Sequence, residues 1–123
     1  MQTLLTVIVL FVNVVIQPWR GGIVASGTGP DGTQCVVTQS WNGFSGGEFY
    51  SVRLHARKPG EQWLWHYIDH EATRWRSCKM TFSEDGDRLF TVGGDRKRRT
   101  FDLTRGRPSE APPHLPPEME DRR

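Results

Sequence analysis

The sequence predicts an all-β protein: a single small antiparallel sandwich or partly open barrel of six to seven short strands, preceded by an N-terminal hydrophobic helix. Runs rich in Val, Phe, Tyr and Trp recur at a spacing of roughly 8–14 residues, which is typical of such folds. Clusters of Gly, Pro and Asp separate these runs and supply turns. No amphipathic helical pattern lies between them, so a parallel sheet is not expected.

Length and charge narrow the possible classes of protein. The chain has 123 residues, which suits one compact domain rather than two. It carries 16 Lys and Arg against 14 Asp and Glu, a formal net charge of +2. This mixed charge lacks the one-sign field of a general nucleic-acid binder, so nucleic acid is not a favoured partner.

The first element is a hydrophobic run from Leu4 to Ile16, interrupted only by Thr6 and Asn13. Its length is that of the apolar region of a signal peptide. We therefore expect residues 1–22 to be a signal peptide or membrane anchor, contacting the membrane through residues 4–19 if uncleaved. The protein is then exported or membrane-anchored, with the periplasmic or extracellular side favoured. The alternative is a buried core strand, because Val and Ile favour β structure.

Residues 23–104 form the predicted antiparallel β domain. The clearest alternation runs from Tyr50 to Arg57, where every second side chain is apolar and the others are polar or charged. The Pro59-Gly60 pair that follows has the chemistry of a type II turn. The expected strands are Cys35–Trp41, Tyr50–Arg57, Trp63–Asp69, Trp75–Phe82, Arg88–Val92 and Lys97–Leu103.

The stretch Trp63–Asp69 allows two readings. As a strand, it places Trp63, Trp65 and Tyr67 on one face, and aromatic residues favour strands. As a helix, it gives a face that mixes charged and apolar residues. The strand is the preferred interpretation. Tryptophans in a small β domain most often belong to the core, and a stacking platform for a ligand is the alternative.

The composition changes after Leu103. Residues 105–123 include Pro108 and two Pro-Pro pairs, with few apolar side chains. Such a composition predicts a Pro-rich disordered or extended tail.

The chain has two cysteines, Cys35 and Cys78, and they lack the spacing of a metal site. Both fall on the apolar side of their expected strands. In an exported protein this arrangement predicts a disulfide across the core. In a reducing compartment the two would stay as buried thiols.

One local stretch resembles a known family. Residues 82–95, from Phe82-Ser-Glu-Asp-Gly-Asp to Gly-Gly-Asp95, and Thr100-Phe-Asp-Leu103 are similar to the later half of a WD40 propeller repeat. Phe101 stands where that family has Trp, and no second copy recurs at the repeat period of roughly 40 residues. The resemblance implies a β-hairpin here and carries over no functional residue.

No motif predicts a catalytic or cofactor-binding residue. The chain has no GxSxG, P-loop or dinucleotide-binding pattern, and its glycine clusters are those of turns. His66 and His70, with Asp69 or Glu71, are weak candidates for metal ligands. On a strand these two rings lie about 13 Å apart, so a shared metal requires a turn between them.

The strongest charge cluster is Arg96, Lys97, Arg98 and Arg99. Such a patch suits anionic lipid head groups or an acidic partner, whereas nucleic acid is the less favoured ligand. The simplest alternative is a solvated hairpin whose charges prevent pairing between sheet edges.

Together these features predict a non-enzymatic binding or structural module, exported or membrane-tethered, that contacts a protein or envelope component of unknown identity. Two other functions stay open. One is a metal-dependent or hydrolytic enzyme that uses His66, His70 and Asp69 or Glu71. The other is a charged-surface binder of anionic lipid or nucleic acid that uses Arg96–Arg99.

Overall fold

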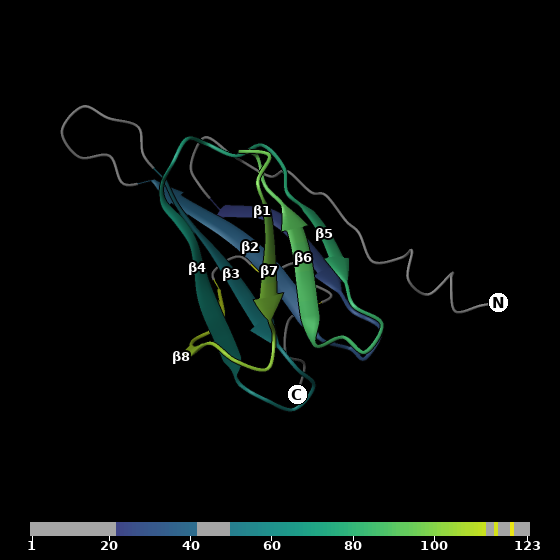
Figure 1. The fold of residues 1–123 in the computed structure, drawn as a ribbon. Helices are drawn as coiled ribbons and strands as arrows, with labels where there is room; N and C mark the ends of the chain where they lie inside the picture. Colours follow the sequence, from purple (N-terminus) through teal and green to yellow (C-terminus); the bar gives the residue numbers. More distant parts are fainter. Residues whose placement is uncertain (1–21, 42–49, 113–114, 116–118, 120–123) are drawn as a thin grey trace.

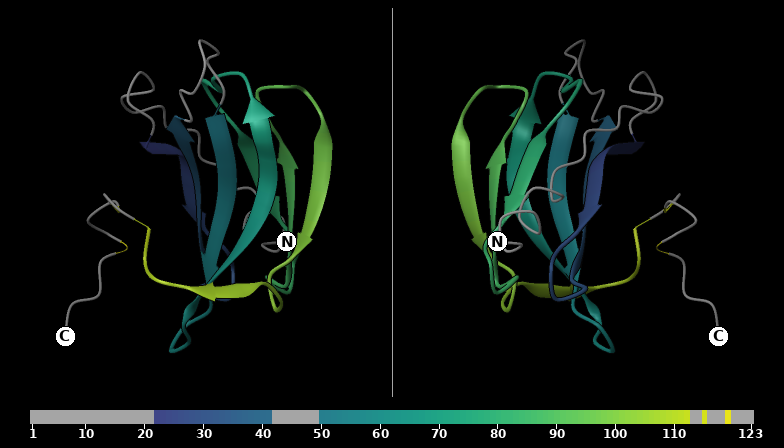
Figure 2. Two further views of the ribbon diagram at one scale, coloured as in Figure 1. Left: turned by 90° about the vertical axis from the view of Figure 1, so that its left-hand side faces the viewer. Right: turned by 90° about the vertical axis from the view of Figure 1, so that its right-hand side faces the viewer.

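The computed structural model describes residues 22–41 and 50–112, together with residues 115 and 119 (Figure 1). This part of the chain is all-β, as predicted, and its eight strands form two antiparallel sheets of five and three strands. The sheets face each other across a shared apolar core (Figure 2). The predicted N-terminal helix and targeting segment lie outside the described residues, except for Gly22.

The larger sheet begins as a meander of four consecutive strands, which are β1 (Gly22–Thr28), β2 (Gln34–Trp41), β3 (Tyr50–Arg57) and β4 (Trp63–Ala72). The fifth strand, β8 (Arg107–Ser109), returns from later in the chain and pairs with β4 along Trp63–Trp65. The order is therefore β1-β2-β3-β4-β8. A proline at position 108 suits this place, because proline in sheets is confined largely to edge strands.

The smaller sheet contains β5 (Lys79–Phe82), β6 (Arg88–Val92) and β7 (Arg98–Asp102), in that order. The turn between β5 and β6 is closed by Gly86 N donating to Ser83 O at 3.0 Å. Gly86 adopts a φ of 80°, which only glycine reaches without strain. This hairpin is the one that the propeller resemblance implied.

The core forms where the apolar positions of both sheets meet. In β3 the alternation predicted from the sequence holds, because Val52, Leu54 and Ala56 all face inward and are buried. Met80 and Leu89 of the smaller sheet complete the same cluster. Each side chain of this size stabilises the fold by roughly 1.5–3 kcal/mol when it leaves water.

Trp75 anchors the connection between β4 and β5. The sequence placed it in a strand, but the strand begins only at Lys79. Gln39 holds the Trp75 backbone from both sides: it accepts from Trp75 N and donates to Trp75 O, each at 3.0 Å. The buried indole ring packs against Gly93, where an added Cβ would overlap it. The connection is therefore held in place by Trp75, although this residue does not belong to a strand.

The outer face of the larger sheet carries a second apolar cluster. Ile23, Val36 and Trp63 pack there with Leu115 and Met119 of the C-terminal segment. Arg57 lies over the Trp63 ring, with its guanidinium carbon 4.8 Å from the ring centroid. Within the tail that the sequence predicts to be disordered or extended, β8 is therefore paired with β4, and Leu115 and Met119 pack on the larger sheet.

The predicted disulfide is not present. Cys35 and Cys78 are both buried free thiols. The alternation of side chains along a strand correctly predicted that both cysteines point inward. It does not predict how close the two lie along the facing sheets. A disulfide needs Cα atoms about 4.4–6.8 Å apart and side chains directed at each other, and alternation along a strand does not supply that geometry. The Cys78 thiol instead lies 3.8 Å from Lys79 O.

Candidate functional site

An open cleft lies between β4 of the larger sheet and β7, the edge strand of the smaller sheet. Its volume is about 410 Å³. Seven residues line it: Trp65, His66, Tyr67, Phe101, Arg105, Gly106 and Arg107. They come from β4, from β7 and from the segment that connects β7 to β8. We call this site the β4–β7 cleft.

The alternation of β4 shapes one wall of the cleft. His66 points toward the smaller sheet, and its ring lies 5.5 Å from the Phe101 ring in an edge-on arrangement. Trp65 and Tyr67 point to the outer face, with ring centroids 5.5 Å apart and planes at 86°. The strand therefore presents aromatic surface on both sides of its edge.

Gly106 allows the connecting segment to pass close to β4. Its φ is 144°, and a Cβ there would lie 3.0 Å from His66 Nε2 and from the Leu64 Cβ. A larger residue would strain this passage. Since Arg105 and Arg107 flank the glycine, the same turn brings two exposed cations to the cleft.

Arginines cover the aromatic pair on the outer face. The guanidinium carbon of Arg53 lies 4.6 Å from the Trp65 centroid and 5.3 Å from that of Tyr67. Arg107 lies 5.4 Å from the Trp65 centroid. Such contacts contribute about 0.5–1 kcal/mol each at exposed sites. These ring contacts hold the guanidinium groups in place, and the N–H groups of the guanidinium can still donate hydrogen bonds to an anionic ligand.

His66 leaves hydrogen-bonding capacity in the cleft wall. Its Nε2 atom is buried and has no hydrogen-bond partner among the described residues. Most buried polar atoms in folded proteins do have one. The close passage of Gly106, where a Cβ would lie 3.0 Å from this nitrogen, covers it from solvent.

The backbone between His66 and His70, the weak candidates for metal ligands, is part of one strand. Both lie in β4, which is extended from Trp63 to Ala72, so the required turn between them is missing. The side chains of His70 and Glu71 lie outside the described set. Among the described residues, no group of three His, Cys, Asp or Glu is placed to hold a metal ion.

The predicted patch Arg96–Arg99 is divided between two faces of the molecule. Arg99 points inward and binds Asp95 through two hydrogen bonds, of 3.1 and 2.7 Å. That bond raises the pKa of Arg99 and, from the other side, lowers the pKa of Asp95. Arg98 points outward, whereas Arg96 lies in the β6–β7 turn with a φ of 66°.

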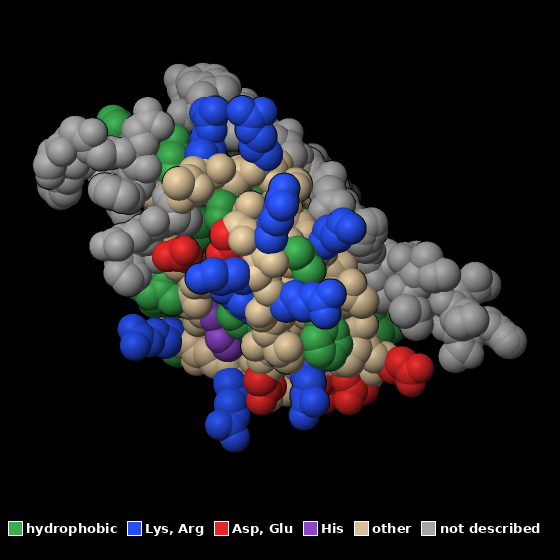
Figure 3. All heavy atoms as spheres, turned by 45° about the horizontal axis from the view of Figure 1, so that its top comes forward, with side chains coloured by type: hydrophobic (Ala, Val, Ile, Leu, Met, Phe, Trp, Pro, Cys, Tyr) green, Lys and Arg blue, Asp and Glu red, His purple; other side chains and the backbone are tan. Residues whose placement is uncertain are grey.

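The outer face of the smaller sheet forms a different basic surface. Lys79, Val92 and Arg98 are paired across the three strands, and we call them the basic row. Phe90 occupies the next outward position of β6 and is 43% exposed, while Val92 is 36% exposed. Figure 3 shows Lys and Arg side chains around hydrophobic ones on this side of the molecule.

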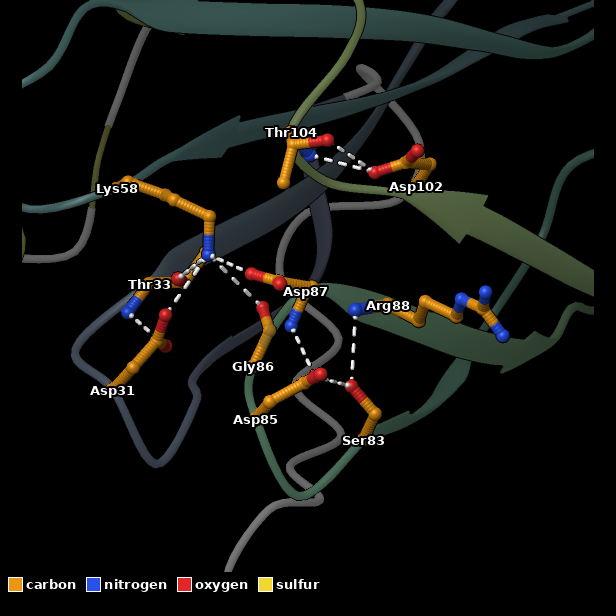
Figure 4. Close-up of polar contacts among 10 residues, drawn as sticks. All are labelled: Asp31, Thr33, Lys58, Ser83, Asp85, Gly86, Asp87, Arg88, Asp102 and Thr104. Atoms are coloured by element: carbon orange, nitrogen blue, oxygen red, sulfur yellow. Dashed lines mark hydrogen bonds and ion pairs between the residues drawn. The ribbon is translucent and has the colours of Figure 1, made fainter.

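The opposite end of the molecule is acidic and is held by its own contacts (Figure 4). Lys58 Nζ lies 2.9 Å from both Asp31 Oδ2 and Asp87 Oδ1 and donates to Gly86 O at 3.3 Å. These bonds to two carboxylates raise the pKa of Lys58 against the opposing effect of its burial. The cluster joins three turns, so its role is structural.

A second hollow, about 440 Å³, lies beside this end and is lined by Ser83, Asp85, Asp87, Arg88, Phe90, Asp102 and Thr104. The carboxylates of Asp85 and Asp102 accept hydrogen bonds from residues of the turns in which they lie. Asp85 accepts from Ser83 Oγ at 2.7 Å, and Asp102 accepts from Thr104 Oγ1 at 2.6 Å. The pKa of Asp85 is lowered by a hydrogen bond from Asp87 N, at 2.9 Å, and by the one from Ser83, and that of Asp102 is lowered chiefly by its bonds from Thr104.

Two thiols and one further imidazole are buried inside the fold. Burial raises the pKa of the Cys35 thiol and brings that of Cys78 to about 12, so neither is a thiolate at neutral pH. His55 is buried, with Nε2 3.1 Å from Thr38 Oγ1. Its imidazole fills the outer layer of the larger sheet.

Comparison with known proteins found no family model, curated protein or solved structure that matches the chain. The described residues contain no helix long and apolar enough to cross a membrane.

From the sequence alone, tryptophans are expected chiefly in the core, and no role is predicted for Arg53, Arg105, Gly106 or Arg107. A signal was present. Arg53 and Arg57 lie on the same face of one strand, and Trp63 and Trp65 lie on the same face of the next. Adjacent antiparallel strands with such patterns place cations over aromatic rings.

Proposed function

We propose that the chain is a small non-enzymatic binding module, exported or membrane-tethered, that holds an extended acidic segment of a partner protein in the β4–β7 cleft. The observation that carries this proposal is the cleft itself, with two exposed arginines and two aromatic rings beside one sheet edge. Concave sites with a few convergent polar groups are typical ligand sites.

The edge of β4 supports an extended ligand. β4 spans ten residues, Trp63–Ala72, but β8 pairs with only Trp63–Trp65. No other described strand lies along the rest of this edge. Exposed sheet edges bind peptides by adding a strand, with main-chain hydrogen bonds for affinity and side-chain pockets for specificity.

The charge of the cleft selects among extended ligands. Arg53 and Arg107 lie over the aromatic pair, and all three arginines of the site are exposed. Arg105 lines the same cleft, where its Nε also lies 3.6 Å from Asp102 Oδ2. Arginine binds carboxylates in a bidentate manner, whereas a basic segment would be repelled. The exported or membrane-tethered location is supported by the hydrophobic run from Leu4 to Ile16.

Peptide binding followed by NMR tests this function. The probe is a fluorescein-labelled octapeptide of alternating Glu and Val, and its control is the same pattern with Lys in place of Glu. The acidic peptide should bind and shift the amide signals of His66 and Ile68. Shifts confined to β1 and β2, or equal binding of both peptides, would rule out the cleft.

A matched pair of variants locates the binding. Arg105→Ser/Arg107→Ser should weaken binding of the acidic peptide at least tenfold. Arg74→Ser/Arg76→Ser removes the same charge from exposed positions in the β4–β5 connection. That control should bind the peptide nearly as tightly as the wild type. Equal losses would mean that net charge, rather than the cleft, governs binding.

A further inference from the structure

We infer that the outer face of the smaller sheet docks on an anionic lipid bilayer, with its basic end toward the membrane. The contact is made by the basic row, Lys79, Val92 and Arg98, and by Phe90. This surface lies on the other sheet from the aromatic and arginine-covered face of β4, so the inference does not depend on peptide binding in the cleft.

Charge along β6 changes in one direction. At one end Val92 lies between Lys79 and Arg98. In the middle Phe90 lies between Thr81 and Thr100, and at the other end Arg88 lies opposite Asp102. The face is therefore basic at one end, neutral in its centre and nearly balanced at the other.

The loops extend this gradient. Those near the basic row carry four exposed cations: Arg74, Arg76, Arg96 and Lys97. The turns at the opposite end carry five acidic residues, Asp31, Glu61, Glu84, Asp85 and Asp87, against the two cations Lys58 and Arg105, so they are net acidic. A bilayer with a negative surface attracts the first end and repels the second. The molecule is thereby oriented before any contact forms.

The exposed apolar side chains suit a lipid surface. Phe90 and Val92 stand together on the central strand, flanked by cations whose long stems can lie along apolar surface. Insertion of such groups at the boundary between head groups and acyl chains adds apolar burial to the electrostatic attraction. No precise shape match is needed there.

A second copy of this chain fits the same face poorly. In a two-fold interface each basic row would meet its equivalent or lie beside it, and like charges would be opposed. An acidic protein is the remaining competitor. It shares the charge requirement but also needs a central anchor pocket, and the described hollow beside Phe90 is lined with carboxylates.

The test is co-sedimentation of the full chain with vesicles. One set is pure phosphatidylcholine and the other contains 30 mol% phosphatidylserine, about the anionic content that produces a substantial surface potential. The hydrophobic run near the N-terminus contributes equally to both, so the readout is the gain in affinity with phosphatidylserine. We expect a gain of at least tenfold that disappears at about 0.5 M salt.

Two charge-matched variants separate the face from net charge. Lys79→Gln/Arg98→Gln should lower the gain roughly 25-fold or abolish it, because each cation near an anionic surface contributes about fivefold. Thr28→Glu/Gln62→Glu makes the same net charge change at exposed sites near the acidic end and should retain most of the gain. Phe90→Ser should weaken binding to both vesicle sets.

Three outcomes overturn the inference. The wild type gains nothing from phosphatidylserine, or both charge variants lose it equally, or the basic row binds poly-glutamate while vesicles do not compete. The last result would assign the face to an acidic protein. All substituted residues are exposed, so far-UV circular dichroism of each variant should match that of the wild type and confirm folding.

Discussion

Mild acid should destabilise this fold through one buried histidine. His55 is 7% exposed and lies on the outer side of β3. Burial, with a smaller contribution from the charge of Arg53, lowers its pKa from 6.5 to about 4. Protonation would place a charge in the layer beneath Arg53, where Nδ1 has no partner among the described residues. The folded state therefore holds the imidazole neutral.

The sign of the effect follows from proton linkage. Between the folded pKa of about 4 and the unfolded pKa of 6.5, the unfolded chain binds a proton that the folded chain does not. The free energy of unfolding is therefore fully retained above pH 6.5 and falls as the pH decreases. At pH 5 the loss from this single group is about 2 kcal/mol relative to pH 7.

Urea unfolding at pH 7, 6 and 5 measures this loss, with His55→Gln as the control. Glutamine keeps a polar group near Thr38 Oγ1 but does not titrate. The midpoint should fall steeply with pH in the wild type and stay nearly level in the variant. The carboxylates with lowered pKa values lose their contribution only in stronger acid. Parallel pH profiles for the two proteins would refute this account of His55.

Three further predictions concern packing and covalent state. Lys58→Met removes the ion pairs at the acidic end and should lower the free energy of unfolding by about 1–2 kcal/mol in urea titrations. Because salt screens ion pairs, the difference between the variant and the wild type should shrink at high salt, and a difference that does not depend on salt would contradict this role. Gly93→Ala forces a methyl group into the Trp75 ring and should cost about 1–3 kcal/mol, measured by thermal unfolding; an unchanged midpoint would contradict the packing. Cys35 and Cys78 should react with a thiol reagent only after unfolding, and reductant should leave the melting temperature unchanged, whereas a reductant-dependent melting temperature would reveal a disulfide.

The alternation of apolar residues was sufficient to predict most of the fold. Strands β2, β3, β4, β6 and β7 appear within a residue or a few of their predicted bounds, because each buries one face and has turn residues at its ends. β1 was missed since Gly22–Thr28 is built largely from small residues and follows directly on a longer hydrophobic run. β8 was missed because three residues with a central proline become a strand only by pairing with β4.

The candidate site was harder to predict than the fold. Arg98 and Arg99 are neighbours in sequence, but alternation in a strand sends them to opposite faces, so the apparent cluster of four cations is not a single surface. The basic row unites Lys79 and Arg98 from two strands that are not adjacent, which requires the register of the small sheet. Local sequence does not contain that register.

The return of β8 to the first sheet has a consequence for synthesis of the protein. β4 is made early, yet the segment that covers Trp63 includes Met119, more than fifty positions later. While the ribosome is still producing the smaller sheet, the outer apolar cluster stays uncovered by its own chain. A nascent protein of this design exposes a hydrophobic surface to chaperones until Leu115 and Met119, which follow its last strand, have emerged.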